Sequence, residues 1–285
     1  MLSNRTKFSH EFFIPKKIVT YLGGFFANVQ VGFIKNHLIK WFIRVYQVNM
    51  KEALEDNPTH YACFNDFFIR RLRADVRPIA DALMTSPVDG CVSEIGRIEA
   101  GQLLQAKKLF YTVKELLGCD EETSARFING YFTTLYLSPK DYHRVHMPIT
   151  GTLKKMIYIP GALFSVQPSS AQTIPKLFAR NERLVVYFET EIGVMAMVLV
   201  GATIVGAIGT TWHGDLKRQK ERRVFDYSTT SNPTTLKKGE EMGHFKLGST
   251  VILLLESSSP MTWVESLLPG VDLRLGESIG EKTRN

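Results

Sequence analysis

Three residues far apart in this chain, Asp89, His146 and Ser249, are of the types that form a nucleophilic triad. In such a triad the imidazole removes the serine proton, and the carboxylate holds the imidazole in the orientation that this transfer needs. Any long chain contains these residue types in some order, so the types alone carry little weight. The sequence around each residue has to decide between a catalytic and a structural role.

Each of the three also has a structural interpretation. Asp89 precedes Gly90, and Asp-Gly is a common turn pair. Gly248 and Ser249 could form a turn or a bulge before the apolar run that follows them. The hydrolase motif Gly-x-Ser-x-Gly is not matched, because Val251 stands where its last glycine should be.

A metal site is not expected from the histidines and cysteines. His143 and His146 have the spacing of two metal ligands, but no third ligand lies near them and His-Glu-x-x-His is absent from the sequence. The three cysteines are far apart and form no Cys-x-x-Cys pair. Their odd number argues against a disulfide framework and fits a reducing compartment. These cysteines are Cys63, Cys91 and Cys119.

The remaining sequence predicts the elements that would position these side chains. The 285 residues, with 44% hydrophobic and 22% charged, have the balance of a globular protein with one large domain or two small ones. Seven apolar runs of strand length are separated by Gly, Pro and Asp, with few long helical stretches between them. We therefore expect an α+β fold with a β-rich antiparallel body behind a helical N-terminus. The runs are 88–95, 131–137, 156–159, 184–188, 194–200, 204–208 and 251–255.

The positive charge of the chain is concentrated at its N-terminus. Residues 1–50 contain seven basic residues and one acidic residue, so they carry +6 of the net charge of +7. Nucleic acid or an anionic membrane surface could each account for this excess. The same segment is rich in large aromatic residues, which favours the membrane.

An amphipathic helix is predicted from residue 34 onward. Its apolar stripe would contain Ile34, Leu38, Trp41, Phe42 and Val45, and its polar side Asn36, Lys40, Arg44 and Gln47. Such a helix can lie in the lipid interface with its basic groups near lipid phosphates. Packing of the stripe on the protein core is the alternative.

We do not expect the N-terminal segment to span a membrane. Residues 18–34 are uncharged over 17 residues, which is at the lower limit for a spanning helix, and polar residues and a Gly-Gly pair interrupt them. A cleaved signal peptide is disfavoured by the same interruptions and by the absence of a clear Ala-x-Ala site. The segment is therefore interpreted as peripheral.

Two motifs resemble a known family. Asp-Tyr-His-Arg-Val-His-Met-Pro at 141–148 and Leu-Gly-Ser-Thr at 247–250 are similar to the signatures of the phosphatidylserine decarboxylases, in their bacterial, membrane-associated branch. Further blocks at 64–68, 160–166, 177–183 and 200–206 match the family in order and spacing. The similarity extends from about residue 11 to residue 255, and the tail after Glu256 departs from it.

The resemblance implies a self-processing enzyme. The chain would cut itself between Gly248 and Ser249 into a large chain, 1–248, and a small chain, 249–285, and Ser249 would become a covalent pyruvoyl group. His146, oriented by Asp89, would act as the general base of this cleavage. The pyruvoyl ketone would then form a Schiff base with phosphatidylserine and release CO₂ to give phosphatidylethanolamine.

The resemblance also implies further roles and partners. His143 would donate the proton in decarboxylation, and Ser165 is a candidate for binding the substrate. We expect a helical membrane-docking region over 1–75, a catalytic domain over 76–285 and a homodimer of processed protomers. The expected location is peripheral, on the cytoplasmic face of the cell membrane, with phosphatidylserine in an anionic membrane as the partner and no nucleic acid or metal.

Two other functions stay open at this point. One is a serine esterase or lipase that uses Asp89, His146 and Ser249 directly on lipid and keeps an intact chain. The other is a non-catalytic membrane-binding protein that uses only its basic N-terminus, in which replacing Ser249 would have no biochemical effect.

Overall fold

The body of the protein is built on one large antiparallel sheet. The computed structural model describes residues 27–202, 207–246 and 249–283. Every strand pair in the sheet is antiparallel, as the sequence predicted. In order, the strands are β12 (Arg223–Asp226), β7 (Gly151–Ile159), β8 (Arg183–Thr190), β9 (Gly193–Gly201), β15 (Ser249–Leu255), β5 (Tyr131–Leu137), β2 (Gly90–Arg97) and β17 (Asp272–Leu273), and β13 (Thr235–Leu236) also pairs with β7.

Strand β15 lies inside this sheet, between β9 and β5, and all seven of its residues are buried. A strand covered on both faces needs apolar residues at every position, which explains the unbroken run from Val251 to Leu255. Six of the seven predicted apolar runs fall within or across a strand of the large sheet. The seventh, 204–208, overlaps β10, but its first three residues lie outside the described residues.

Smaller sheets complete the body. A four-stranded sheet has the order β11 (Gly214–Leu216), β10 (Ala207–Thr210), β14 (Glu241–Lys246) and β6 (Arg144–His146). A three-stranded sheet has the order β1 (Met84–Thr85), β18 (Ser278–Lys282) and β16 (Met261–Trp263), and a hairpin joins β3 (Gln102–Ala106) to β4 (Leu109–Thr112). Short helices cover parts of the body, namely α5 (Val113–Leu117), α6 (Glu121–Ala125), α7 (Pro168–Ala171) and α8 (Leu177–Arg180).

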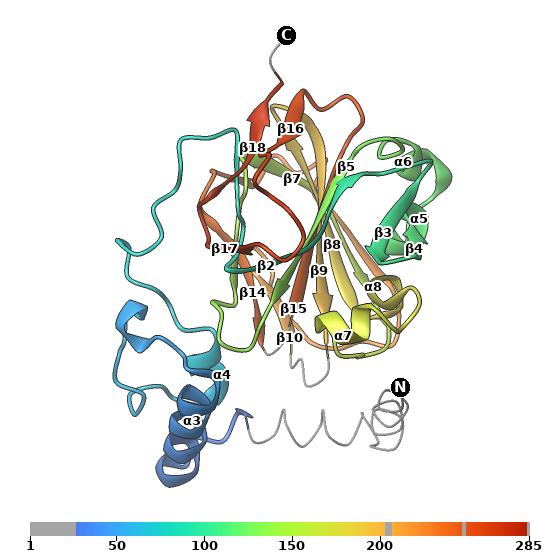
Figure 1. The fold of residues 1–285 in the computed structure, drawn as a ribbon. Coiled ribbons are helices and arrows are strands. Elements are labelled where there is room, and N and C mark those ends of the chain that lie inside the picture. The colour runs from blue at the N-terminus through green and yellow to red at the C-terminus, as the bar shows by residue number, and fades with distance from the viewer. Residues whose placement is uncertain (1–26, 203–206, 247–248, 284–285) are drawn as a thin grey trace, which may run out of the picture.

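The N-terminal part has its own hydrophobic cluster. Helix α3 (Gly32–Tyr46) packs on the short helix α4 (Phe64–Phe68), and η1 (Met50–Glu52) lies between them in the sequence. Phe42 makes edge-to-face contacts with Phe64, Phe67 and Phe68, with ring centroids 5.0, 5.9 and 6.0 Å apart. Figure 1 shows α3 and α4 at one end of the strand-rich body.

The predicted apolar stripe of this helix is divided by the structure. Phe42 and Ile39 are buried in the cluster that includes α4, so Phe42 of the stripe belongs to the core. Lys35 is also buried, and its amine donates to the Thr59 carbonyl at 2.8 Å. Ile34, Trp41 and Val45 stay exposed, as does Phe33, which is 75% exposed. No helix within the described residues is long and apolar enough to cross a bilayer. The expectations for residues 1–26 lie outside the described residues.

Candidate active site

Ser249 occupies a buried position at the start of the central strand. It is the first residue of β15 and pairs with Leu137 of β5 and Gly201 of β9. Its side chain is 0% exposed, and Oγ has no hydrogen-bond partner among the residues that the structure describes. A buried hydroxyl without a partner is unfavourable by about 1–3 kcal/mol, so it is a group that the fold alone does not explain. A hydroxyl closed to solvent fits attack on the chain's own backbone better than attack on an external ester.

His143 is held just before β6 with one free ring nitrogen. Nδ1 lies 2.9 Å from the Asp141 carbonyl oxygen, and since a carbonyl only accepts, Nδ1 carries the proton. Nε2 is buried and has no hydrogen-bond partner in the described part of the chain, so it presents a lone pair. The ring packs against Phe68 with centroids 4.1 Å apart. Burial, and to a smaller extent the charge of Arg70, lower the pKa of His143 to about 3, so its ring is neutral at physiological pH.

His146 is fixed at both ring nitrogens. Nδ1 donates to the Gly239 carbonyl oxygen at 2.8 Å, which leaves Nε2 as the acceptor for the Tyr142 hydroxyl at 3.2 Å. Burial lowers the pKa of His146, while the bond to Gly239 opposes this shift. The ring is therefore a neutral base at physiological pH, and Nε2 is its basic atom.

Backbone pairing brings the three sequence motifs together. His146 donates its backbone N–H to the Pro87 carbonyl at 2.9 Å, which ties β6 to the Asp89 segment. Phe245 of β14 donates to the carbonyl of His143 at 3.0 Å. Phe245 precedes Ser249 by four residues, and four residues of chain reach at most about 14 Å. The length of this connection therefore limits the distance between the His143 backbone and the start of β15, where Gly248, itself outside the described residues, precedes Ser249 in the sequence.

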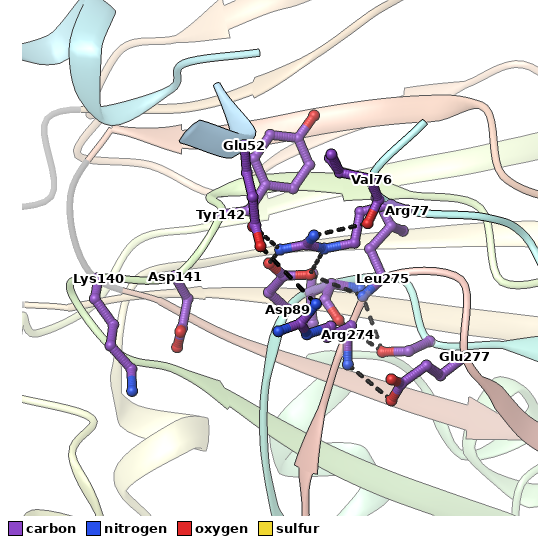
Figure 2. A network of polar contacts seen from close by, with 12 residues as sticks. Glu52, Val76, Arg77, Asp89, Lys140, Asp141, Tyr142, Arg274, Leu275 and Glu277 are labelled. Atoms are coloured by element: carbon purple, nitrogen blue, oxygen red, sulfur yellow. Dashed lines mark hydrogen bonds and ion pairs between the residues drawn. The ribbon is translucent and has the colours of Figure 1, made fainter. Parts of the chain in front are cut away.

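Asp89 is engaged by a different partner from the one the sequence suggested. Its two carboxylate oxygens accept from Nε and Nη2 of Arg77 at 2.8 and 2.6 Å, and one of them also accepts from the Leu275 backbone N–H at 2.8 Å. Arg77 also bonds Glu52 at 2.7 Å, and Figure 2 shows its guanidinium between the two carboxylates. Burial opposes ionisation of Arg77, but these hydrogen bonds raise its pKa. Within the described residues, Asp89 makes no hydrogen bond to His146.

Ser165 lies in the segment between β7 and α7 and is partly buried. The neighbouring Phe164 is anchored through both backbone groups by the side chain of Asn181, at 3.0 and 2.9 Å. The same Asn181 amide donates to the carbonyl of Gly201 at 2.9 Å, and Gly201 pairs with Ser249. Asn181 therefore connects the Ser165 segment to the strand end beside Ser249.

A cavity of about 670 Å³ lies beside Asp89 and the start of the 141–148 block. Asp89, Ser138, Asp141 and Tyr142 line it, together with Arg70 from the end of α4. Asp141 and Tyr142 of the 141–148 block line it, whereas His143, His146 and Ser249 are not among its lining residues. Its volume lies within the usual range of small-molecule pockets. Among the described residues, no three His, Cys, Asp or Glu side chains cluster as metal ligands.

Sequence reasoning missed four residues of this site: Arg70, Arg77, Tyr142 and Asn181. Tyr142 and Asn181 stand inside the blocks at 141–148 and 177–183, so their positions were available but their contacts were not. Arg70 and Arg77 belong to an Arg-rich stretch that a sequence pattern cannot distinguish from a solvated surface.

Comparison with known proteins identifies the family. A family model described as phosphatidylserine decarboxylase matches residues 64–281, and a second, described as PSD, matches residues 11–47. The phosphatidylserine decarboxylase proenzyme of Legionella pneumophila (strain Lens) is 56% identical over 267 residues, which is 94% of each chain. Those of Shewanella denitrificans and Vibrio cholerae are both 50% identical, over 98% and 96% of this chain and 98% of each relative. The chain belongs to the phosphatidylserine decarboxylase family.

Proposed function

We propose that this chain is the proenzyme of a phosphatidylserine decarboxylase, a carboxy-lyase that cuts itself between Gly248 and Ser249. The observation that carries the proposal is Ser249 itself. It is the buried first residue of a central strand, and its Oγ has no hydrogen-bond partner among the described residues. The 141–148 block supplies two buried histidines with lowered pKa values as candidate bases. The identity of 50–56% to relatives named as proenzymes of this activity supports the same function.

The cleavage begins with attack of Ser249 Oγ on the carbonyl carbon of Gly248. A new C–O bond forms as the C–N bond breaks, and the released amine of Ser249 takes up a proton. We assign the base role to His146, because Gly239 holds the proton on Nδ1 and leaves Nε2 to accept. Tyr142 then has to yield its hydrogen bond to this nitrogen.

The resulting ester is broken by elimination. Loss of the Ser249 α-proton cleaves the C–O bond, leaves Gly248 with a carboxylate and frees the small chain, 249–285. Rearrangement and hydrolysis of the new end release ammonia and leave a pyruvoyl group, which supplies an electron sink for decarboxylation. The unpartnered Ser249 hydroxyl fits this group, because no hydrogen bond has to be broken to consume it.

Asp89 is proposed to act through the position of its segment. The carboxylate is bonded to Arg77 and Leu275, and the neighbouring Pro87 carbonyl accepts from the backbone of His146. In the uncut chain this arrangement supports β6 and thereby the base. A direct bond from His146 Nδ1 to Asp89 would require this nitrogen to release the Gly239 carbonyl.

His143 is proposed to deliver the proton to the product carbon. Its Nε2 bears a lone pair in the uncut chain, so it has to take up a proton before it can give one. The Phe68 ring against it limits access of water to this nitrogen. Ser165, on the segment that Asn181 connects to Gly201, is proposed to contact the substrate.

The N-terminal part is proposed to dock the enzyme on an anionic membrane that contains phosphatidylserine, at its cytoplasmic face. The exposed Phe33, Ile34, Trp41 and Val45 and the exposed basic Lys40 support this role. The separate hydrophobic cluster around Phe42 supports a docking region over 1–75 beside a catalytic domain over 76–285. A homodimer of processed protomers is part of the same proposal.

Intact mass spectrometry of purified protein tests the proposal. We expect two chains separated after Gly248, with the small chain lighter by one ammonia molecule than a chain that starts with serine. Borohydride should abolish activity, and Ser249→Ala should leave one uncut chain. An active preparation that contains only the intact 32.3 kDa chain would refute the proposed pyruvoyl cofactor and support an esterase instead.

A further inference from the structure

Arg70 is a buried cation without a carboxylate partner. Its side chain follows α4 and the residue is 4% exposed, and within the described residues no ion pair includes it. Burying an unpaired charge is costly, so such cations normally have an anion or a full set of hydrogen bonds. Burial lowers the pKa of Arg70, and the smaller effects of Tyr61, Asp89 and Asp141 only partly oppose this shift.

Its hydrogen bonds do not compensate for this burial. Nη2 donates to the Lys140 carbonyl at 2.9 Å and makes a longer contact of 3.5 Å with the Asp141 carbonyl. Nε and Nη1 are buried and have no hydrogen-bond partner among the described residues. Arg183 provides the comparison, because it is equally buried but donates from all three nitrogens to backbone carbonyls. Arg70 therefore has hydrogen-bonding capacity that the protein does not use.

The unused capacity lies beside the candidate active site. Arg70 lines the 670 Å³ cavity together with Lys140, Tyr142 and Ser138. The Asp141 carbonyl that Nη2 approaches also accepts from Nδ1 of His143. Four acidic side chains of the same cavity have other partners: Asp89 and Glu52 bond Arg77, the Asp141 carboxylate accepts from the Ser138 backbone at 2.7 Å, and Glu277 accepts from the Arg274 backbone. The fifth acidic residue, Asp272, is exposed.

We propose that Arg70 binds the phosphodiester of the substrate headgroup, with the exposed Lys140 as a second cation at the cavity. The inference rests on the proposed function for the identity of the substrate. A guanidinium is suited to phosphate because its N–H groups match two oxygens at once. Nε and Nη1 are shielded from water in the uncut chain, so the guanidinium turns towards the cavity when the anion enters.

The phosphodiester is favoured over the carboxylate for a chemical reason. The carboxylate leaves as CO₂, and a guanidinium bound to it would stabilise the ground state more than the transition state. The phosphodiester is unchanged by the reaction and carries its charge throughout. Holding it fixes the headgroup beside His143 without opposing the loss of CO₂.

Thermal unfolding of the uncut Ser249→Ala protein tests binding without any catalysis. The probes are glycerophosphoethanolamine, which has the phosphodiester but no carboxylate, and free serine, which has the carboxylate but no phosphodiester. We expect glycerophosphoethanolamine to raise the unfolding temperature and serine to leave it unchanged, because a ligand of the folded state stabilises it by mass action. No shift with the diester, or a shift with serine alone, would overturn the proposal without reference to any variant.

Variants locate the effect. Arg70→Gln should lose the shift, Arg70→Lys should keep part of it, and the matched control Arg71→Gln, at the exposed neighbouring position, should keep all of it. In the processed enzyme, Arg70→Gln should raise KM for micellar phosphatidylserine by on the order of 10- to 100-fold, with a smaller change in kcat. An unaltered shift in Arg70→Gln, or a change confined to kcat, would refute the assignment. If the natural chain shows no decarboxylase activity but diester binding still depends on Arg70, the binding role of Arg70 is retained and the proposed function is removed.

Discussion

Arg77 and Asp89 share two hydrogen bonds at a site where their side chains are 9% and 10% exposed. Glu52 from the N-terminal part and Leu275 from the last part of the described chain join the same network (Figure 2). One buried ion pair therefore connects the N-terminal part, the candidate site and the segment that would become the small chain.

Replacing one partner of this pair should be strongly destabilising. Arg77→Met leaves the buried Asp89 carboxylate without its counter-ion, and we expect a loss of about 3–5 kcal/mol in the free energy of unfolding. Urea unfolding in the uncut Ser249→Ala background measures this. The control is Arg73→Met, whose ion pair with Asp75 is solvent-exposed and should contribute little. Equal losses in the two variants would show that the Arg77 pair is not a structural anchor.

Variants of His146 and His143 should affect different steps, self-cleavage and decarboxylation respectively. His146→Ala should remain a single chain, because it lacks the proposed base. His143→Ala should still cut but should release no CO₂ from phosphatidylserine. Gel electrophoresis and CO₂ release measure the two steps, with His213→Ala as the control at an exposed position. A His143 variant that fails to cut would show that His143 is also needed for self-cleavage, and would contradict the assignment of separate steps to the two histidines.

The pH profile of self-cleavage follows from the lowered pKa of His146. Because the neutral ring is the base, and burial keeps it neutral below the ordinary pKa of about 6.5, the cleavage rate should stay flat through that pH and fall only under more acidic conditions. Rates measured on freshly refolded protein across this range give the profile. A midpoint at or above the ordinary value would mean that the base is a different, solvent-exposed group.

Stability should fall in acid because of His143. Its folded-state pKa is about 3, against an unfolded value of about 6.5, so between these values the unfolded chain binds a proton that the folded chain does not. The free energy of unfolding should decrease by roughly 1.4 kcal/mol for each pH unit below the unfolded pKa. In the Ser249→Ala background, His143→Asn should show a shallower decrease between about pH 6 and about pH 4. Identical slopes would mean that His143 is not buried as a neutral ring.

Membrane docking should depend on the exposed side of α3. Phe33→Ser combined with Trp41→Ser should reduce sedimentation with phosphatidylserine-containing vesicles by roughly tenfold or more, while self-cleavage continues. Deletion of residues 1–45 is a less selective test, because it also removes the core residue Phe42. If the double variant binds vesicles as well as the natural chain does, docking resides elsewhere.

The sequence was sufficient to predict most of the large sheet. Run 131–137 coincides with β5, and run 251–255 covers all but the first two residues of β15, because buried strands are continuous apolar runs bounded by turns. The sequence also singled out Ser249, His143 and His146, whose roles stay predictions. The three-residue strand β6 is not among the predicted runs, because so short a strand has no detectable period.

The partners of the site residues were not predictable in the same way. Asp89 bonds Arg77, which is 12 residues away in the sequence, and Leu275, which is 186 residues away. Only the folded arrangement specifies such contacts. The stripe on α3 was predicted correctly as apolar, but the division between its buried and exposed members depends on where α4 packs. Periodicity describes one helix and cannot reveal its neighbour.

The position of β15 has a consequence for the life cycle of the enzyme. This strand, together with β16, β17 and β18, would belong to the small chain, and β15 is hydrogen-bonded on both sides within the large sheet. Cleavage therefore would follow folding, and the two pieces would stay interleaved with no covalent bond between them. Once denatured and diluted, they would have to find each other in a second-order reaction and insert a central strand late. Activity lost by unfolding would then be restored chiefly by new synthesis, so the mature enzyme would persist through slow unfolding and not through refolding.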